Sequence, residues 1–288
     1  MSHKPRKSTV SPVVFESFVV HCKLRQQFWQ DNGWTVQWLE DSGSSDAAKR
    51  DLLAAQKANV LLVDPIETEK WLHRLNKSSQ DLRRVGFLDS IWLDKGVYWP
   101  QTIYPEALRD LMVKVGKSLD FSGCAYIAPS SAAWGRLCAL AAFDLGYRKI
   151  RFICNDLALT EAIKAQIEKF CFGIEIEGLE TAGVTLQPNN GSLLMNACDL
   201  KNDPDMKQTL LYLNFVRPGS LIVDIPFSSQ ASALEQEALS ANYEVISNSQ
   251  VRGVFDFLIL RRLGLVDGKD RQTYLEKWQA FLKSTPAT

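Results

Sequence analysis

The residues with the clearest chemical potential form a short turn between a strand and a helix. Residues 125–128 are apolar and typical of a strand, residues 135–145 predict a helix, and residues 149–154 predict a second strand. Such a unit binds dinucleotides when a glycine-rich turn lets the backbone approach a pyrophosphate. Here the turn consists of Pro129, Ser130, Ser131 and Ala132. The pattern predicts a Rossmann-like frame without the usual pyrophosphate cradle.

Two interpretations of this turn remain open. In the first, the hydroxyls of Ser130 and Ser131, with the helix N-terminus at Ala132, hold an anion such as a cofactor phosphate. In the second, a serine caps the helix and does nothing more. The second is favoured, because Pro129 offers no N–H and because side chains obstruct the close approach that glycine permits.

Asn155 and Asp156 end the second predicted strand, where ribose recognition takes place in such units. An acidic residue there accepts a hydrogen bond from the 2′-hydroxyl of NAD and repels the extra phosphate of NADP. Asp156 is equally suited to cap the helix predicted over residues 157–170. If a cofactor binds, these residues favour NAD over NADP.

Composition argues against several classes of function. The 288 residues carry 33 basic and 33 acidic side chains, and a general nucleic-acid-binding protein needs a basic excess. No apolar run approaches the ~18 residues of a membrane span, and residues 1–12 lack the apolar core of a signal peptide. Six cysteines and three histidines show no metal-site spacing. We therefore expect a cytoplasmic protein with reduced thiols and no metal, nucleic-acid or membrane partner.

Alternating apolar and amphipathic segments predict an α/β protein with a mostly parallel sheet. The unbroken apolar run at residues 59–63 is typical of a buried parallel strand. Further strands are predicted at 17–21, 35–39, 173–176, 192–196, 220–224 and 243–246, a hairpin at 87–99, and further helices at 24–32, 46–57, 67–75, 104–115, 253–263 and 271–283.

The order of several short motifs resembles the shikimate dehydrogenase family. Residues 88–108 look like the family's VNTI–DG–NTDxxGxL block, and Asn196-Ala197-Cys198 looks like its NAT element. Residues 221–225 look like the strand before its YNP element, and 245–248 like its VIDG stretch. The resemblance implies an α/β substrate-type domain, a Rossmann-like doubly wound domain, and C-terminal helices that return to the first domain. We expect these parts at 17–118, 119–250 and 251–288, after a disordered tail over 1–16.

The family's proton-transfer pair is missing from the matching positions. The VTxPxK motif matches residues 62–67 and puts Glu67 in place of the catalytic lysine, while Ile103 replaces the catalytic aspartate. The resemblance implies that this pair exchanges a proton with the substrate hydroxyl, and such help is worth about 10² to 10⁴ in rate. Ile103 has no titratable atom, and Glu67 would repel an acidic substrate. Little of the parent reaction is therefore expected.

The substrate-binding positions depart from the family as well. Asp89 replaces the Asn of VNT, Phe255 replaces a substrate-binding glutamine, and the serine motif is at best Cys22-Lys23-Leu24. His21 lies near the expected cleft, although a lone histidine is more often structural. Glu67 is either a general base with a raised pKa or an acidic residue that complements a helix dipole.

Three hypotheses follow. The first is a pseudoenzyme, which keeps the fold and serves as a binding or interaction module. The second is an active NAD(P)-dependent oxidoreductase of the shikimate or quinate type with an altered substrate. The third is that the motif alignment has slipped and that Lys70 or Asp64 is catalytic. The expected partners are a small molecule in the interdomain cleft and, as an option, a second copy of the chain in a homodimer.

Overall fold

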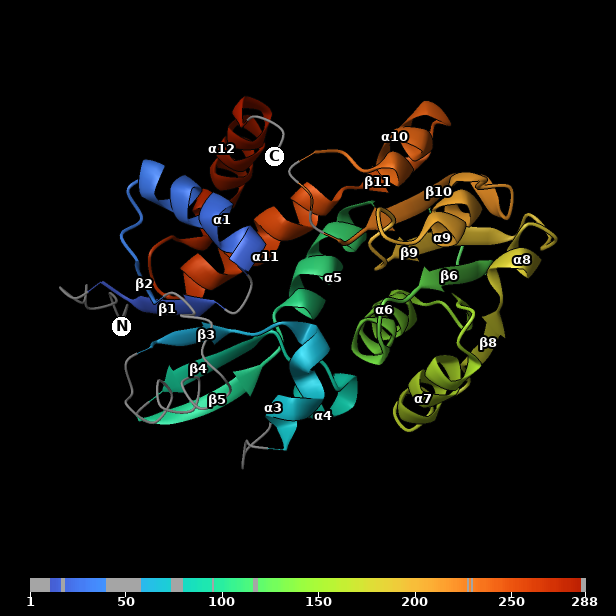
Figure 1. The fold of residues 1–288 in the computed structure, drawn as a ribbon, viewed down its shortest axis with the longest axis horizontal. Coiled ribbons are helices and arrows are strands. Elements are labelled where there is room, and N and C mark those ends of the chain that lie inside the picture. The colour runs from blue at the N-terminus through green and yellow to red at the C-terminus, as the bar shows by residue number, and fades with distance from the viewer. Residues whose placement is uncertain are drawn as a thin grey trace. The chain divides into compact units, whose positions relative to one another are not determined.

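The computed structural model of the chain describes residues 11–16, 19–39, 58–73, 80–94, 96–115, 119–226, 228 and 230–285. These residues form two compact units (Figure 1). The first holds the described residues up to Arg83 together with Leu88–Ile103 and Gly253–Ser284. The second holds Arg84–Phe87 and Tyr104–Arg252, so the helix α5 (Tyr104–Val115) groups with the second unit and not with the first.

The first unit contains a five-stranded mixed sheet in the order β2-β1-β3-β4-β5. Strands β1 to β3 are parallel, and β4 and β5 form the predicted antiparallel hairpin. All three residues of β3 are buried, as the apolar run predicts. The strands are β1 (Val13–Glu16), β2 (Gln37–Leu39), β3 (Val60–Leu62), β4 (Ser90–Asp94) and β5 (Val97–Gln101).

Two predictions near the N-terminus are wrong. Residues 13–16 are not part of a tail, because they form β1 between β2 and β3, with Val14 fully buried. The strand predicted at 17–21 does not form, because α1 (Val19–Asp31) begins at Val19. Two β-branched apolar runs lie close together here, and only the first has neighbouring strands to pair with.

The helices of the first unit share an aromatic core. Phe28 of α1 makes edge-to-face contacts with Tyr274 and Trp278, at centroid distances of 5.4 and 5.0 Å. The C-terminal helices therefore pack on the N-terminal unit, as the fold prediction states. The helical elements are η1 (Pro65–Glu67), α3 (Thr68–Leu72), α4 (Gln80–Val85), α11 (Asn248–Arg262), η3 (Gly268–Asp270) and α12 (Arg271–Ser284).

The second unit contains a six-stranded parallel sheet in the order β11-β10-β9-β6-β7-β8. In chain order this is the doubly wound arrangement of dinucleotide-binding domains, so the predicted fold class is confirmed. The strands are β6 (Cys124–Ala128), β7 (Lys149–Ile153), β8 (Glu175–Leu179), β9 (Gly191–Asn196), β10 (Val216–Asp224) and β11 (Glu244–Ile246). The helices between them are α6 (Ala132–Leu145), α7 (Leu157–Ile167), α8 (Thr181–Val184), α9 (Pro204–Leu211) and α10 (Ala233–Ser240).

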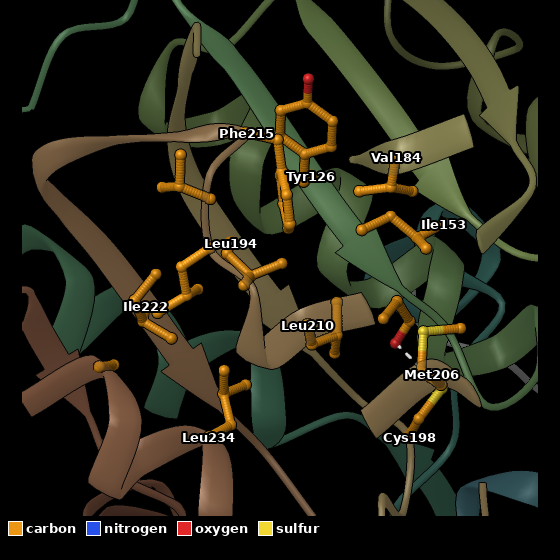
Figure 2. Packing of buried hydrophobic residues seen from close by; sticks show 14 of the residues in the cluster. Tyr126, Ile153, Val184, Leu194, Cys198, Met206, Leu210, Phe215, Ile222 and Leu234 are labelled. Atoms are coloured by element: carbon orange, nitrogen blue, oxygen red, sulfur yellow. Dashed lines mark hydrogen bonds between the residues drawn. The ribbon is translucent and has the colours of Figure 1, made fainter. Parts of the chain in front are cut away.

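An apolar core joins this sheet to α9 and α10. Figure 2 shows Leu194 of β9 and Ile222 of β10 packed with Leu210 of α9 and Leu234 of α10. All four side chains are fully buried. This packing holds α9 and α10 against the sheet, and the two helices begin after their side-chain caps Asp203 and Ser232.

Some predicted boundaries shift and some cannot be compared. The strand predicted at 173–176 lies at Glu175–Leu179, because Gly173 adopts a positive φ of 71° and turns the chain before it. The helix predicted from 253 begins at Asn248. The helix predicted over 46–57 lies outside the described residues. Among the helices that are described, none combines the length and the apolar character needed to cross a membrane.

Candidate functional site

The carboxyl edge of the six-stranded sheet is the candidate site of the second unit. The strand order reverses between β6 and β9, and ligands of doubly wound sheets bind at this switch point. Ala128 and Asn196 end these two strands side by side, and the Ala197 N–H donates to the Ala128 carbonyl over 2.9 Å. The residues after Ala128 and after Asn196 therefore border the crevice.

The turn after β6 begins a helix and offers few groups to an anion. Ser131 is the N-cap of α6, and its Oγ accepts a hydrogen bond from the Trp134 N–H at 3.3 Å. Pro129 is buried and has no N–H, while Ser130 is exposed. Ala132 is the first helical residue, three residues earlier than predicted, because Ser131 caps the helix there. The capping interpretation therefore describes what Ser131 does in this structure.

The two polar residues after β7 are engaged in local hydrogen bonds. Asp156 caps α7, and its Oδ1 accepts from the N–H groups of Ala158 and Leu159 at 2.9 and 3.1 Å. Asn155 Oδ1 accepts from the N–H and the hydroxyl of Thr181 at 2.9 and 3.1 Å, which fixes the start of α8. Both residues are exposed at the strand end where a ribose would lie.

Carboxylates lie near two buried cysteines at this edge. Asp203, the N-cap of α9, raises the pKa values of both Cys154 and Cys198, although burial is the main cause of each shift. The pKa of Cys198 reaches about 12, and Asp199 contributes to it as well. These carboxylates would oppose the approach of a pyrophosphate, whereas Lys201 and Lys207, which line the cavity at the ends of β9 and β10, would attract it.

In the first unit, Asp89 and Ile103 are bound to each other. Asp89 Oδ2 accepts a hydrogen bond from the Ile103 N–H at 2.6 Å, and its Oδ1 accepts from the Ser90 hydroxyl at 2.9 Å. Asp89 is only 1% exposed and the Ile103 side chain is fully buried. The carboxylate of Asp89 therefore holds the chain after β5, and no side-chain group at Ile103 reaches solvent.

Glu67 ends the 3-10 helix that follows β3. It lies half-buried just before α3, in the first turn where a carboxylate complements the helix dipole. Asp64 caps this short helix, since its Oδ1 accepts from the Ile66 N–H at 2.9 Å. Lys70 lies one helical turn further along the chain, in α3.

Phe255 is part of the interior of the first unit. It is 3% exposed, and the Arg25 guanidinium lies 5.9 Å from the centre of its ring. Arg25 also forms a fully buried ion pair with Asp256, with Nη2 2.7 Å from Oδ1. Because an ion pair fills the space beside Phe255, this position is a packing position. His21 and Cys22 lie in the first turn of α1, the helix that carries Arg25.

A buried polar cluster at the ends of β9 and β10 was not predicted from the sequence. Asn196 Nδ2 donates to Asp224 Oδ1 at 2.7 Å, and both residues are 1% exposed. The signal was present, because Asp224 follows an apolar strand and Asn196 ends another. Within the described residues, no group of three or more His, Cys, Asp or Glu side chains is arranged to hold a metal ion.

Comparison with known proteins identifies solved structures with the same architecture. No family model and no curated protein matches the sequence. Among solved structures, quinate dehydrogenase from Corynebacterium glutamicum in complex with NAD is similar, with a TM-score of 0.76 and 13% identity over 94% of this chain and 99% of that one. The chain has the shikimate dehydrogenase fold.

Two further structures share this shikimate dehydrogenase fold. Shikimate 5-dehydrogenase from Listeria monocytogenes, in complex with shikimate and NAD, has a TM-score of 0.66 and 13% identity over 96% of this chain and 94% of that one. The ligand-free 5-ketofructose reductase of Gluconobacter sp. strain CHM43 has a TM-score of 0.72 and 11% identity over 95% and 99%. At such identities the likeness establishes the fold alone.

Proposed function

We propose that this protein is a small-molecule-binding module with the shikimate dehydrogenase fold and without dehydrogenase activity. The observation that carries the proposal is the turn after β6. Its Ser131 hydroxyl accepts from the Trp134 N–H, and Pro129 supplies no donor. A dinucleotide needs glycine-like space beside its pyrophosphate at this place, whereas Pro129, Ser130 and Ser131 all carry side chains there.

The first unit supports the same conclusion. A dehydrogenase of this fold must move a proton to or from the substrate hydroxyl, which requires a titratable group within hydrogen-bond reach. At the position of the family's aspartate, Ile103 is fully buried and its N–H is held by Asp89. At the position of the lysine, Glu67 carries the opposite charge. Neither position supplies the side chain that the family uses for this proton transfer.

The competing function is an active NAD-linked oxidoreductase with a changed substrate. One observation favours it: Asp156 presents an exposed carboxylate at the end of β7, where it would accept from the 2′-hydroxyl of NAD. Because Asp156 already caps α7 through Oδ1, its place at the strand end has a structural explanation as well.

A fluorescence titration with NADH and NADPH separates the two functions. We expect no saturable change up to millimolar cofactor, and no reduction of NAD or NADP with shikimate or quinate. A catalytically active shikimate dehydrogenase serves as positive control in both assays. Saturable NADH binding that the Asp156→Ala variant loses, or turnover with either substrate, would establish the dehydrogenase instead.

A further inference from the structure

A cavity of about 380 Å³ lies in the first unit, beside the turn that joins α1 to β2 (Figure 1). Its volume is at the lower end of the ~300–1,000 Å³ of small-molecule pockets. None of the described residues that line it is charged: they are Gln26, Gln30, Gly33, Trp34, Thr35, Val36 and Trp38. The cavity is therefore separate from the carboxyl edge of the six-stranded sheet and differs from it in chemistry.

The end of α1 positions the two tryptophans of this cavity. Gly33 ends the helix with a φ of 76°, which suits glycine, and the Trp34 N–H donates to the Trp29 carbonyl at 3.0 Å. From there the chain runs on to β2, with Trp34, Val36 and Trp38 half-buried at alternate positions. This alternation is typical of an extended chain with one covered face. The two indoles therefore lie on the same face of the segment.

Buried aromatic rings hold both indoles in place. The ring centroid of Trp34 lies 5.2 Å from that of Tyr274 and 5.7 Å from that of Phe28. The centroid of Trp38 lies 5.3 Å from that of Trp29. Tyr274 is 1% exposed, and Phe28 and Trp29 are fully buried. Because the indoles are fixed by packing, a ligand that stacks on them would lose little binding energy to side-chain ordering.

The cavity also carries polar groups that are available to a ligand. Gln26 and Gln30 lie one turn apart on the same face of α1. Among the described residues, the Gln30 amide and the Thr35 hydroxyl have no hydrogen-bond partner. The indole N–H groups of Trp34 and Trp38 likewise find no acceptor in the described part of the chain. An amide and a hydroxyl can each both donate and accept, whereas an indole N–H only donates.

These features together select a class of ligand. A charged ligand would lose hydration beside a wall that offers no opposite charge, so a neutral ligand is favoured. The negative face of an indole attracts the weakly positive C–H groups of a saturated ring. Side chains that donate and accept match alcohol hydroxyls, and a ligand without hydroxyls would leave these polar groups unpaired. A neutral sugar meets all three conditions.

We propose that this cavity binds a neutral mono- or disaccharide, with a sugar ring stacked on Trp34 or Trp38 and its hydroxyls bound by Gln30 and Thr35. The inference goes beyond the proposed function, because it concerns a different site and does not depend on whether a dinucleotide binds to the second unit. No covalent step is involved.

Saturation-transfer NMR of the full chain tests the proposal, with glucose, galactose, mannose, fructose, maltose, cellobiose and lactose as probes. We expect at least one of them to bind saturably at millimolar concentration. Trp34→Ala should weaken its binding by at least about 10-fold, through the loss of stacking, and Gln30→Leu by about 2- to 10-fold, through the loss of hydrogen bonds. The matched control is Gln27→Leu, on an exposed residue of α1 that does not line the cavity, and it should leave binding unchanged.

Gln30→Leu keeps the test decisive if Trp34→Ala does not fold, because Gln30 is exposed near the end of α1 and leucine is a good helix former. Indole, a neutral aromatic probe without hydroxyls, should bind more weakly than the best sugar. The proposal is overturned if no sugar binds, if Gln30→Leu binds sugars as well as Gln27→Leu does, or if indole binds more tightly than every sugar. The NADH titration is a separate measurement, so a failure of sugar binding would leave the proposed absence of dehydrogenase activity in place.

Discussion

Removing one member of the Arg25–Asp256 ion pair will destabilise the first unit far more than removing both. Nε and Nη2 of Arg25 donate to Asp256 Oδ1 at 2.9 and 2.7 Å, and the two side chains are 1% and 0% exposed. Breaking a buried pair leaves an uncompensated charge and costs about 3–5 kcal/mol, whereas replacing both members with apolar residues is often nearly neutral. Arg25→Met and Asp256→Leu should each cost about 3–5 kcal/mol, and the double variant much less than their sum.

The surroundings of the pair set this magnitude. The guanidinium lies 5.7 Å from the Trp29 ring and 5.9 Å from the Phe255 ring, so methionine keeps much of the packing at this place. Burial raises the pKa of Asp256 above its ordinary value, and Arg25 opposes the shift. In Arg25→Met the opposition is lost, so the folded-state pKa rises further. Relative to wild type, this variant should therefore lose stability as the pH rises above about 7, the folded-state pKa of Asp256 in the wild type.

Urea unfolding followed by tryptophan fluorescence measures the effect, because Trp29 packs against the pair. The Arg84–Asp144 pair is a matched control, with the same 2.7 Å separation and exposures of 34% and 39%. Arg84→Met should cost under about 1 kcal/mol. If Arg25→Met costs no more than Arg84→Met, or if the two buried substitutions are additive, the packed interior around Phe255 is refuted. A binding groove at Phe255 would then return as a hypothesis.

Three further outcomes are expected. Gly191→Ala should lower the free energy of unfolding by about 1–3 kcal/mol, because its Cβ would lie 2.8 Å from the Tyr126 ring and 2.9 Å from the Phe215 carbonyl oxygen. The control Gly183→Ala, whose Cβ would have nothing within 4 Å, should leave the free energy of unfolding unchanged. Equal urea midpoints for the two variants would contradict this expectation. Asp224→Asn should become more stable relative to wild type as the pH rises above 3.8, the ordinary pKa of an aspartate. Burial raises the folded-state pKa of Asp224, so ionisation of this carboxyl group favours the unfolded chain and destabilises the wild type over this range. Parallel stability–pH curves for the two proteins would contradict this expectation. In a Cys22→Ser variant, Ellman's reagent should react with the remaining cysteines only after unfolding, because these five cysteines are buried and the pKa of Cys198 is raised to about 12. Rapid labelling of the native protein would show that these thiols are not buried.

The predicted elements of the second unit were confirmed best. The strands predicted at 125–128, 149–154 and 192–196 all form within a residue or two of the prediction. In the first and the third, the run of apolar residues reflects burial on both faces of a parallel sheet, which leaves little room for another assignment. The helix over 104–115 is likewise confirmed.

The errors near the N-terminus have a different origin. Residues 13–20 contain two apolar runs separated by Glu16 and Ser17, and either run has strand character. Which run pairs is decided by β2 and β3, whose registers with Val14 and Phe15 come from distant parts of the chain. No local pattern carries that information.

For the candidate site, the candidate residues could be predicted from the sequence, but the hydrogen bonds that they form could not. Ser131, Asp156 and Asp89 all occupy positions where a ligand contact was conceivable, and each holds a backbone N–H instead. Those bonds are formed within turns or across the hairpin, so they depend on the local backbone path. The hydrogen bond between Asn196 and Asp224 could not be predicted either, because it joins the ends of two strands that are 28 residues apart in the chain.

The sequence by itself determined the doubly wound architecture and placed Glu67 and Ile103 where the resemblance implies a proton-transfer pair, because hydrophobic periodicity and residue identity are properties of the chain. Only the tertiary structure decided that Val13–Glu16 complete a sheet, that an ion pair fills the interior beside Phe255, and that Asn196 donates to the buried carboxylate of Asp224. Each of these depends on contacts between residues far apart in the chain. Such contacts are set by packing and not by any local pattern.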